Sequence, residues 1–195
     1  MRTTHASRPL AIAAVTAGVV LFAASPSIAG ADRVRGEEPL TAYSVAAGGK
    51  PELVPEGAEA RVQAVYNAAG DSIITLHVTG LLPDHTYGAH AHVNPCGLTG
   101  GAAGPHYQLT PDPDATPTKP STDPGYANPG NEVWLDVTTN AAGNGASLAK
   151  QAWQFPPGKA PRSVIIHDKR TATGAHGDGP AGTAGARLAC VDVSF

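Results

Sequence analysis

The stretch Tyr87-Gly88-Ala89-His90-Ala91-His92-Val93 decides the fold and introduces its chemistry. It has the composition of a short β-strand, and residues two apart in a strand project from the same face. His90 and His92 therefore point the same way, as two imidazoles sharing one metal ion must. Imidazole suits copper, zinc, iron and nickel, so the pair alone does not name the ion. Two ordinary surface or core histidines are the alternative interpretation.

Further runs of strand character surround this stretch, separated by turns rich in Gly, Asn and Pro. Many short strands bounded by such residues indicate an all-β sandwich or barrel. The 23 Gly and 18 Pro among 195 residues argue for a loop-rich fold and exclude a coiled coil. The predicted strands are 40–47, 59–67, 73–79, 87–93, 133–139, 146–154, 163–167 and 187–195.

Two long irregular segments interrupt the strands, a Pro-rich one over 106–131 and a Gly-rich one over 168–186. Loops of this length in a compact domain are usually functional or disordered. Both begin beside a histidine, His106 and His167, which favours a functional role. A histidine that ends a buried strand, as His167 does, can also be an ordinary core residue. Together with the pair at 90 and 92, however, these residues predict a four-histidine metal site.

The ordered set of motifs resembles the Cu/Zn superoxide dismutase family. The resemblance extends from about Leu40 to Phe195 and includes Thr79-Gly80-Leu81 ahead of the histidine pair. The motifs that carry it are Gly88-x-His90-x-His92, Cys96, Gly104-Pro105-His106, His167 and Gly185-x-Arg187-Leu188-Ala189-Cys190. The resemblance implies an eight-stranded Greek-key sandwich with two long loops.

The resemblance also implies roles for individual residues. Copper ligands would be His90, His92 and His167, with His106 matching the histidine that bridges copper and zinc and releases copper on reduction. Arg187 matches the arginine that guides superoxide to the metal, a role that suits the fixed, always-charged guanidinium. A structural arginine at a strand end is the alternative for Arg187. The family's intrasubunit disulfide corresponds to Cys96 and Cys190.

The sequence departs from the family at the zinc site. No histidine occurs between Tyr107 and Ile166, so two zinc ligands of the family are missing. Because a structural zinc ion normally takes four ligands, we expect copper without a normal zinc site. Glu132 is the acidic residue nearest the family's zinc aspartate, and it is predicted to orient His106 as copper-only members suggest. An ordinary solvated side chain is the alternative for Glu132, and Asp136, inside a probable strand, is a poorer candidate.

The first 29 residues predict a secretory signal peptide, with Arg2 and Arg8 ahead of an apolar run that ends near Ala24. This run is shorter than a membrane-spanning helix requires, so no stable membrane anchor is expected; an uncleaved anchor is the alternative. Residues 30–39 are predicted to be a flexible lead-in, and 40–195 to form the copper domain. Two cysteines in an exported chain indicate one disulfide.

Removing the predicted signal peptide takes away Arg2 and Arg8, which leaves 11 basic residues against 16 acidic ones and a formal charge of −5. This balance argues against nucleic-acid binding through phosphate neutralisation. With the predicted export, the resemblance implies a secreted, periplasmic or cell-envelope superoxide dismutase that cycles copper between Cu(II) and Cu(I), with superoxide as its substrate. A non-catalytic copper-binding protein of the same fold is the alternative, and an oligomer is compatible with either. The remaining histidines after the predicted signal peptide, His77, His85 and His176, are expected to be bystanders, and a replacement metal ligand is the alternative for His176.

Overall fold

The computed structural model describes residues 33–43, 48–175 and 177–195. The predicted signal peptide and His176 lie outside these residues. The described chain forms ten strands and one short 3₁₀ helix, η2 (Gly100–Ala103). The strands are β1 (Arg33–Pro39), β2 (Thr41–Ala42), β3 (Glu59–Tyr66), β4 (Ser72–Thr79), β5 (Thr86–Tyr87), β6 (Ala89–His92), β7 (Val137–Thr138), β8 (Gly145–Gln151), β9 (Ser163–His167) and β10 (Arg187–Asp192).

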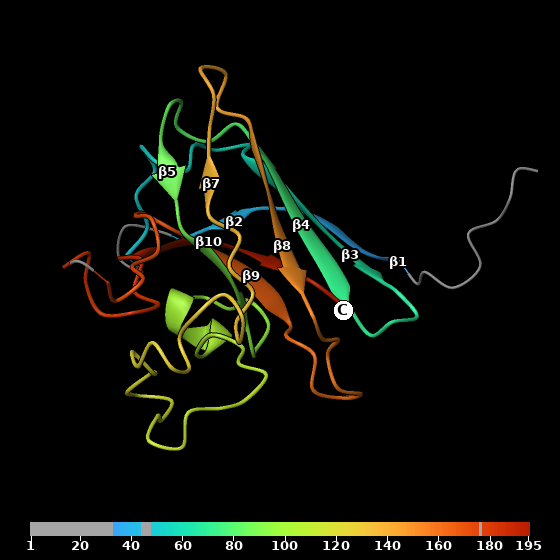
Figure 1. Cartoon of the computed structure of the whole chain (residues 1–195). Helices are drawn as coiled ribbons and strands as arrows, with labels where there is room; N and C mark the ends of the chain where they lie inside the picture. The colour runs from blue at the N-terminus through green and yellow to red at the C-terminus, as the bar shows by residue number, and fades with distance from the viewer. Residues whose placement is uncertain (1–32, 44–47, 176) are drawn as a thin grey trace, which may run out of the picture.

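Eight of these strands make two antiparallel sheets, ordered β1-β3-β4-β8 and β2-β10-β9-β6, and β5 pairs with β7 in a separate ribbon (Figure 1). The predicted all-β class is confirmed. Each predicted strand overlaps an observed one, although 133–139 contracts to β7. The stretch 87–93 divides at Gly88, whose N–H donates to the carbonyl of Lys169 at 2.7 Å. No helix in the described part of the chain is long and apolar enough to cross a bilayer.

Residues 33–39, within the predicted lead-in, take part in the first sheet. This segment forms β1, which pairs along its whole length with β3, from Arg33 opposite Val65 to Pro39 opposite Glu59. Its charged, Gly-containing composition gives no strand signal of its own. Pairing with the edge of an existing sheet supplies the backbone hydrogen bonds that a local pattern does not reveal.

The first sheet follows the alternation expected of a half-buried strand. In β3, Ala60, Val62 and Ala64 are buried, and in β4 so are Ile74 and Leu76. The residues between them are mostly exposed or half-buried. The buried set packs into the main core against the inner face of the second sheet.

Strands β6 and β9 of the second sheet are buried on both faces, because the outer face of the sheet is also covered there. On β6, Ala89 and Ala91 join the main core while His90 and His92 face outward. On β9, Val164 and Ile166 lie in the main core. A second, smaller cluster contains Tyr43, Ala103, Ile165 and Cys190, with Cys96 packed against it.

The predicted disulfide between Cys96 and Cys190 is confirmed, with Cα atoms 5.8 Å apart and a sequence separation of 94. It ties the segment after β6 to β10. The backbone N–H of Cys96 also donates to a carboxylate oxygen of Asp192 at 2.7 Å. The outer face of the second sheet is thus closed at one end by a covalent link.

Replacing both Cys96 and Cys190 by Ser should lower the free energy of unfolding by about 4 kcal/mol, because the opened unfolded chain regains the entropy of a long loop. Urea denaturation of the oxidised wild type and the double variant measures the difference. Reduced wild-type protein is the matched control and should resemble the variant. Equal midpoints for oxidised and reduced protein would contradict this account.

Candidate metal centre

Four histidine side chains converge on one point on the outer face of the second sheet. Each of His90, His92, His106 and His167 offers a ring nitrogen, and these four atoms all lie within 4.8 Å of one another. The ring centroids of His90 and His106 are 4.0 Å apart, and those of His92 and His167 are 5.9 Å apart. All are buried except His106, which is partly exposed. The structure therefore brings together the four residues predicted from the sequence.

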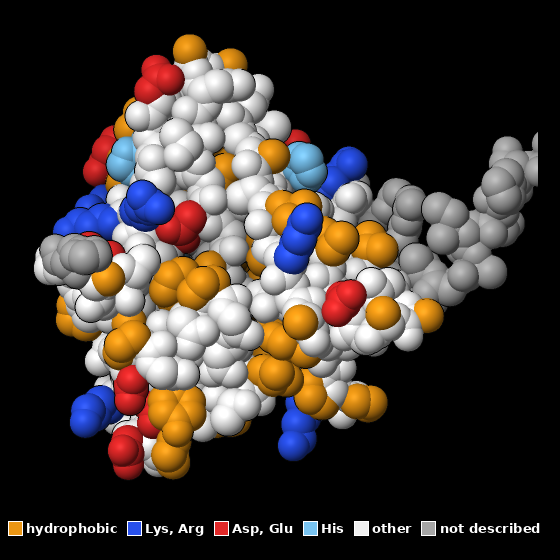
Figure 2. Space-filling model, in the orientation of Figure 1, with side chains coloured by type: hydrophobic (Ala, Val, Ile, Leu, Met, Phe, Trp, Pro, Cys, Tyr) orange, Lys and Arg blue, Asp and Glu red, His pale blue; other side chains and the backbone are white. Residues whose placement is uncertain are grey.

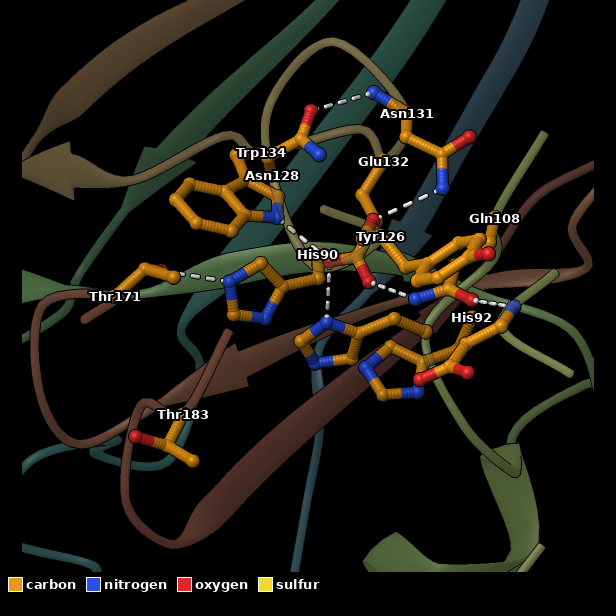
Figure 3. Close-up of polar contacts among 12 residues, drawn as sticks. His90, His92, Gln108, Tyr126, Asn128, Asn131, Glu132, Trp134, Thr171 and Thr183 are labelled. Atoms are coloured by element: carbon orange, nitrogen blue, oxygen red, sulfur yellow. Dashed lines mark hydrogen bonds and ion pairs between the residues drawn. The ribbon is translucent and has the colours of Figure 1, made fainter. Parts of the chain in front are cut away.

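Strand alternation and pairing explain this convergence. His90 and His92 lie two residues apart on β6 and so share the outer face of the sheet. The adjacent strand β9 ends in His167, which lies on the same outer face as Ile165. His106 enters from the Pro-rich segment, where it forms an isolated antiparallel bridge with His92. Three strand positions and one loop position thus supply the set, of which Figure 3 labels His90 and His92.

The hydrogen bonds of two rings define which nitrogen is free. Nδ1 of His92 lies 3.0 Å from the carbonyl of Gly104, and Nδ1 of His106 lies 2.8 Å from a carboxylate oxygen of Glu132. A carbonyl and a carboxylate only accept, so both rings donate from Nδ1. Each ring therefore presents a bare Nε2.

Three of the four rings have buried nitrogens without a hydrogen-bond partner. They are Nδ1 of His90, Nε2 of His92 and both nitrogens of His167. Because nearly all buried polar atoms in proteins are hydrogen-bonded, a convergent group of unpartnered lone-pair donors is what a metal site requires. The residues fit a bound metal ion, and an all-imidazole set suits copper, zinc, iron or nickel.

Burial keeps these rings neutral in the metal-free chain. Desolvation, followed by repulsion from His106, holds the pKa of both His90 and His92 well below the usual value for histidine. Desolvation, with further repulsion from His106 and Arg187, lowers the pKa of His167 to about 3. Neutral imidazole is the form that binds a metal, so protons compete weakly at neutral pH.

Glu132 is a fully buried carboxylate that accepts from three groups. Besides His106, it accepts from Gln108 Nε2 at 2.8 Å and from Trp134 Nε1 at 2.7 Å (Figure 3). The structure thus brings Glu132 to His106, as expected for a group that orients this ring. Gln108 and Trp134 were not anticipated.

A second carboxylate, Asp136, reaches the other side of the centre. Residues 133, 135 and 137 lie in the main core, so alternation directs Glu132, Trp134 and Asp136 to the outer face. Asp136 accepts from the backbone N–H of Thr171 at 2.8 Å, and the Thr171 hydroxyl lies 2.6 Å from Nε2 of His90. In the sequence, its position inside a probable strand made Asp136 a poorer candidate than Glu132. In the structure, the alternation of that same segment places Asp136 beside the histidine cluster.

Arg187 begins β10, directly opposite His167 in the strand register. Its guanidinium donates to the carbonyl of Gly100 at 2.6 Å. Burial lowers the pKa of Arg187 from its ordinary value, yet guanidinium remains charged at neutral pH. Arg187, His106 and His167 together line a cavity of about 950 Å³, which the Pro-rich loop also lines. The sequence-predicted arginine thus stands beside the metal centre.

The described residues hold no second cluster of three or more potential metal ligands. Contacts within the Pro-rich segment order it instead. Asp112 accepts from the Ser121 hydroxyl, and the side-chain amide of Asn131 donates to the carbonyls of Thr110 and Tyr126. Of the predicted bystanders, His77 is exposed on β4, and His85 packs edge-on against Tyr87.

Comparisons with known proteins relate the fold to a solved structure. No family model matches the chain, and no curated protein matches it. A solved structure described as that of the clock protein EA4 has a similar fold, with a TM-score of 0.54 and 17% sequence identity. The match covers 88% of this chain and 99% of that one. At this identity it supports the all-β fold alone. The fold and the site together define a β-sandwich with a largely buried cluster of four histidines that could hold a metal ion.

The metal-free protein should lose stability between pH 7 and pH 5. The unfolded chain takes up protons at histidine near pH 6.5, whereas the buried rings of His90, His92 and His167 resist protonation, so acid favours unfolding. Each such ring lowers the free energy of unfolding by up to about 1.4 kcal/mol for every pH unit that the pH falls in this range. Urea denaturation of chelator-treated protein at both pH values measures it.

The variant His92→Gln removes one buried titrating ring and should show a shallower pH dependence than the wild type. At pH 5 and above most carboxylates stay ionised, so they contribute little to the measured change in stability. Equal stability of the wild type at pH 7 and pH 5 would contradict the burial of neutral rings.

Proposed function

We propose that this chain binds a single copper ion through His90, His92, His106 and His167 and catalyses the dismutation of superoxide. The observation that carries the proposal is the convergence of four imidazoles, with bare buried nitrogens, next to the charged Arg187 at a cavity wall. The order of motifs in the sequence, which resembles that of Cu/Zn superoxide dismutases, supports it.

Copper is the metal that suits both the ligands and the reaction. Zinc binds imidazole equally well but has no redox chemistry. When bound, copper would supply the one-electron couple by which one superoxide is oxidised to dioxygen and a second is reduced, with two protons, to hydrogen peroxide.

His106 is the ring best suited to handle a proton. It is partly exposed, with a side chain 15% accessible, whereas the other three rings are buried. Its Nδ1–H is held by Glu132, so a proton arriving from the cavity would add at Nε2. The resulting imidazolium would lie against the Glu132 carboxylate, which stabilises its charge. Glu132 would thus orient the ring in one state and neutralise it in the other.

Arg187 would attract the anionic substrate. The chain is acidic overall, and on the face shown in Figure 2 positive and negative side chains are interspersed. Attraction of superoxide therefore depends on local charge, and a guanidinium in a low-dielectric cavity wall focuses the field toward the adjacent centre.

A non-catalytic copper-binding protein is the second candidate. The observation that favours it is the lack of a second metal cluster among the described residues, together with the Pro-rich loop that lines the cavity. A carrier has no need of an anion guide, so the arginine beside the histidines favours the enzyme. Export is part of either proposal, since disulfides form and persist in oxidising compartments.

Metal content and turnover measured on the same sample test the proposal. Purified protein supplied with both copper and zinc should retain one copper and no zinc per chain by mass spectrometry, and it should consume superoxide rapidly in pulse radiolysis. Retention of one copper without turnover would establish the non-catalytic alternative. Two metals per chain would refute the copper-only assignment.

Arg187→Ala should reduce kcat/KM for superoxide about tenfold or more while copper content stays the same, since local focusing of an anion accounts for factors of this size. The rate should also become less sensitive to ionic strength. Lys119→Ala, an exposed change of equal charge in the Pro-rich loop, is the control and should leave the rate near that of the wild type. An unchanged rate for Arg187→Ala would refute the guiding role.

A further inference from the structure

A hydrogen-bonded chain links the metal centre to the second long loop. Nε2 of His90, on β6, lies 2.6 Å from the hydroxyl of Thr171, and that hydroxyl lies 2.5 Å from Oδ1 of Asp136. Figure 3 shows the Thr171 hydroxyl directed at the His90 ring. These three residues come from three separate segments of the chain.

Asp136 is held in place as the end of this chain. Its Oδ2 accepts the backbone N–H of Thr171 at 2.8 Å, and its Oδ1 also lies 3.3 Å from the backbone N–H of Ala89. Its neighbours Leu135 and Val137 are buried in the main core, which fixes the backbone beneath it. A carboxylate surrounded by donors acts as an acceptor.

Because Asp136 can only accept, it determines which atom donates in each of these hydrogen bonds. The Thr171 hydroxyl has a single hydrogen and donates it to Asp136, so its oxygen is left to accept from His90. His90 must then carry its proton on Nε2. Its Nδ1, buried and without a partner at the centre of the cluster, is the bare nitrogen.

We infer that Thr171 and Asp136 are positioning residues, which set the tautomer of His90 so that it offers Nδ1 to the metal. His92 and His106 offer Nε2, because their Nδ1 atoms donate to Gly104 and Glu132. The same link attaches the loop 168–186 to the centre, so that metal binding and the position of this loop depend on each other. The part of this inference that concerns metal rests on the proposed copper site; the tautomer does not.

The loop comes close enough for this contact because two glycines leave room for it. A Cβ on Gly88 would lie 2.6 Å from the carbonyl oxygen of Lys169 and 2.7 Å from Cβ of Ala184. A Cβ on Gly185 would overlap the carboxylate of Asp168, which accepts the backbone N–H of Ala186 at 2.7 Å. The loop is therefore packed directly against the start of β6, with Thr171 at the contact.

The tautomer can be read directly in the metal-free protein. Long-range ¹H–¹⁵N correlation spectra of the imidazoles should show the wild-type His90 protonated on Nε2. Thr171→Val keeps the shape of the side chain but removes the hydroxyl, so His90 should lose this preference. Thr171→Ser retains the hydroxyl and should restore it. A wild-type His90 protonated on Nδ1, or an unchanged tautomer in Thr171→Val, would overturn the inference.

Copper affinity supplies the second readout. Loss of the group that orients a metal-ligating histidine typically weakens metal binding 10–100-fold. We expect that loss for Thr171→Val, measured by competition with a chromophoric chelator, with an altered Cu(II) paramagnetic resonance spectrum. Thr171→Ser should bind as the wild type does. Wild-type affinity and spectrum in Thr171→Val would refute the positioning role.

Thr173→Val is the matched control in the same loop. Thr173 donates from both its N–H and its hydroxyl to Asp178, at 2.8 and 2.7 Å, but this pair is exposed and does not contact a histidine of the centre. Its loss should leave the tautomer and copper affinity unchanged. A wild-type chain that binds no copper would refute the proposed function. The expected tautomer, lost in Thr171→Val and kept in Thr173→Val, would still support the positioning of His90.

Discussion

The gathering of four imidazole rings, three of them buried, around one point is the constraint on which the rest of the structure depends. Buried polar atoms need partners, and neighbouring rings cannot become charged together without strong repulsion. The protein meets this constraint by assigning an acceptor to one nitrogen of His90, His92 and His106 and directing the other inward. What remains unpartnered is a set of lone pairs around a single point, which a metal ion would satisfy.

The carboxylates of Glu132 and Asp136 hold the histidine rings in this arrangement, and both come from one short segment. Glu132 gathers His106, Gln108 and Trp134, while Asp136 holds Thr171 and, through it, His90. The core residues between them, Val133 and Leu135, fix the backbone in the sandwich interior. A single alternating segment therefore connects the hydrophobic core with opposite sides of the metal centre, so packing of the core and orientation of the ligands are not independent.

The two long loops are held by ordinary protein contacts on either side of the centre. The Pro-rich loop is braced by the side chains of Asp112 and Asn131. The Gly-rich loop is attached through Thr171 to Asp136 and through the Asp168 carboxylate to Lys50 and the Ala186 N–H. Side-chain hydrogen bonds and an ion pair thus hold both loops, and the described residues contain no second cluster of potential metal ligands.

Local pattern alone determined the all-β class, the common face of His90 and His92, and a cysteine pair suited to one disulfide. These features depend on the period of a strand and on residue type, which a sequence displays directly. The positions of His106 and His167 beside the two long loops grouped them with that pair, and the structure brings the four side chains together. Even the alternation from Glu132 to Val137 was visible, although its meaning for Asp136 was not, because alternation does not say which face carries the site.

Only the tertiary structure decided the remaining contacts. His106 and Glu132 are 26 residues apart, Asp136 and Thr171 are 35 apart, and His90 and Thr171 are 81 apart. Strand β1 likewise depends on β3 for its hydrogen bonds and has no signal of its own. Such contacts are set by which strands pair and where loops cross the sheet. No local period encodes that choice, so the sequence specifies the ligands while the fold specifies how they are held.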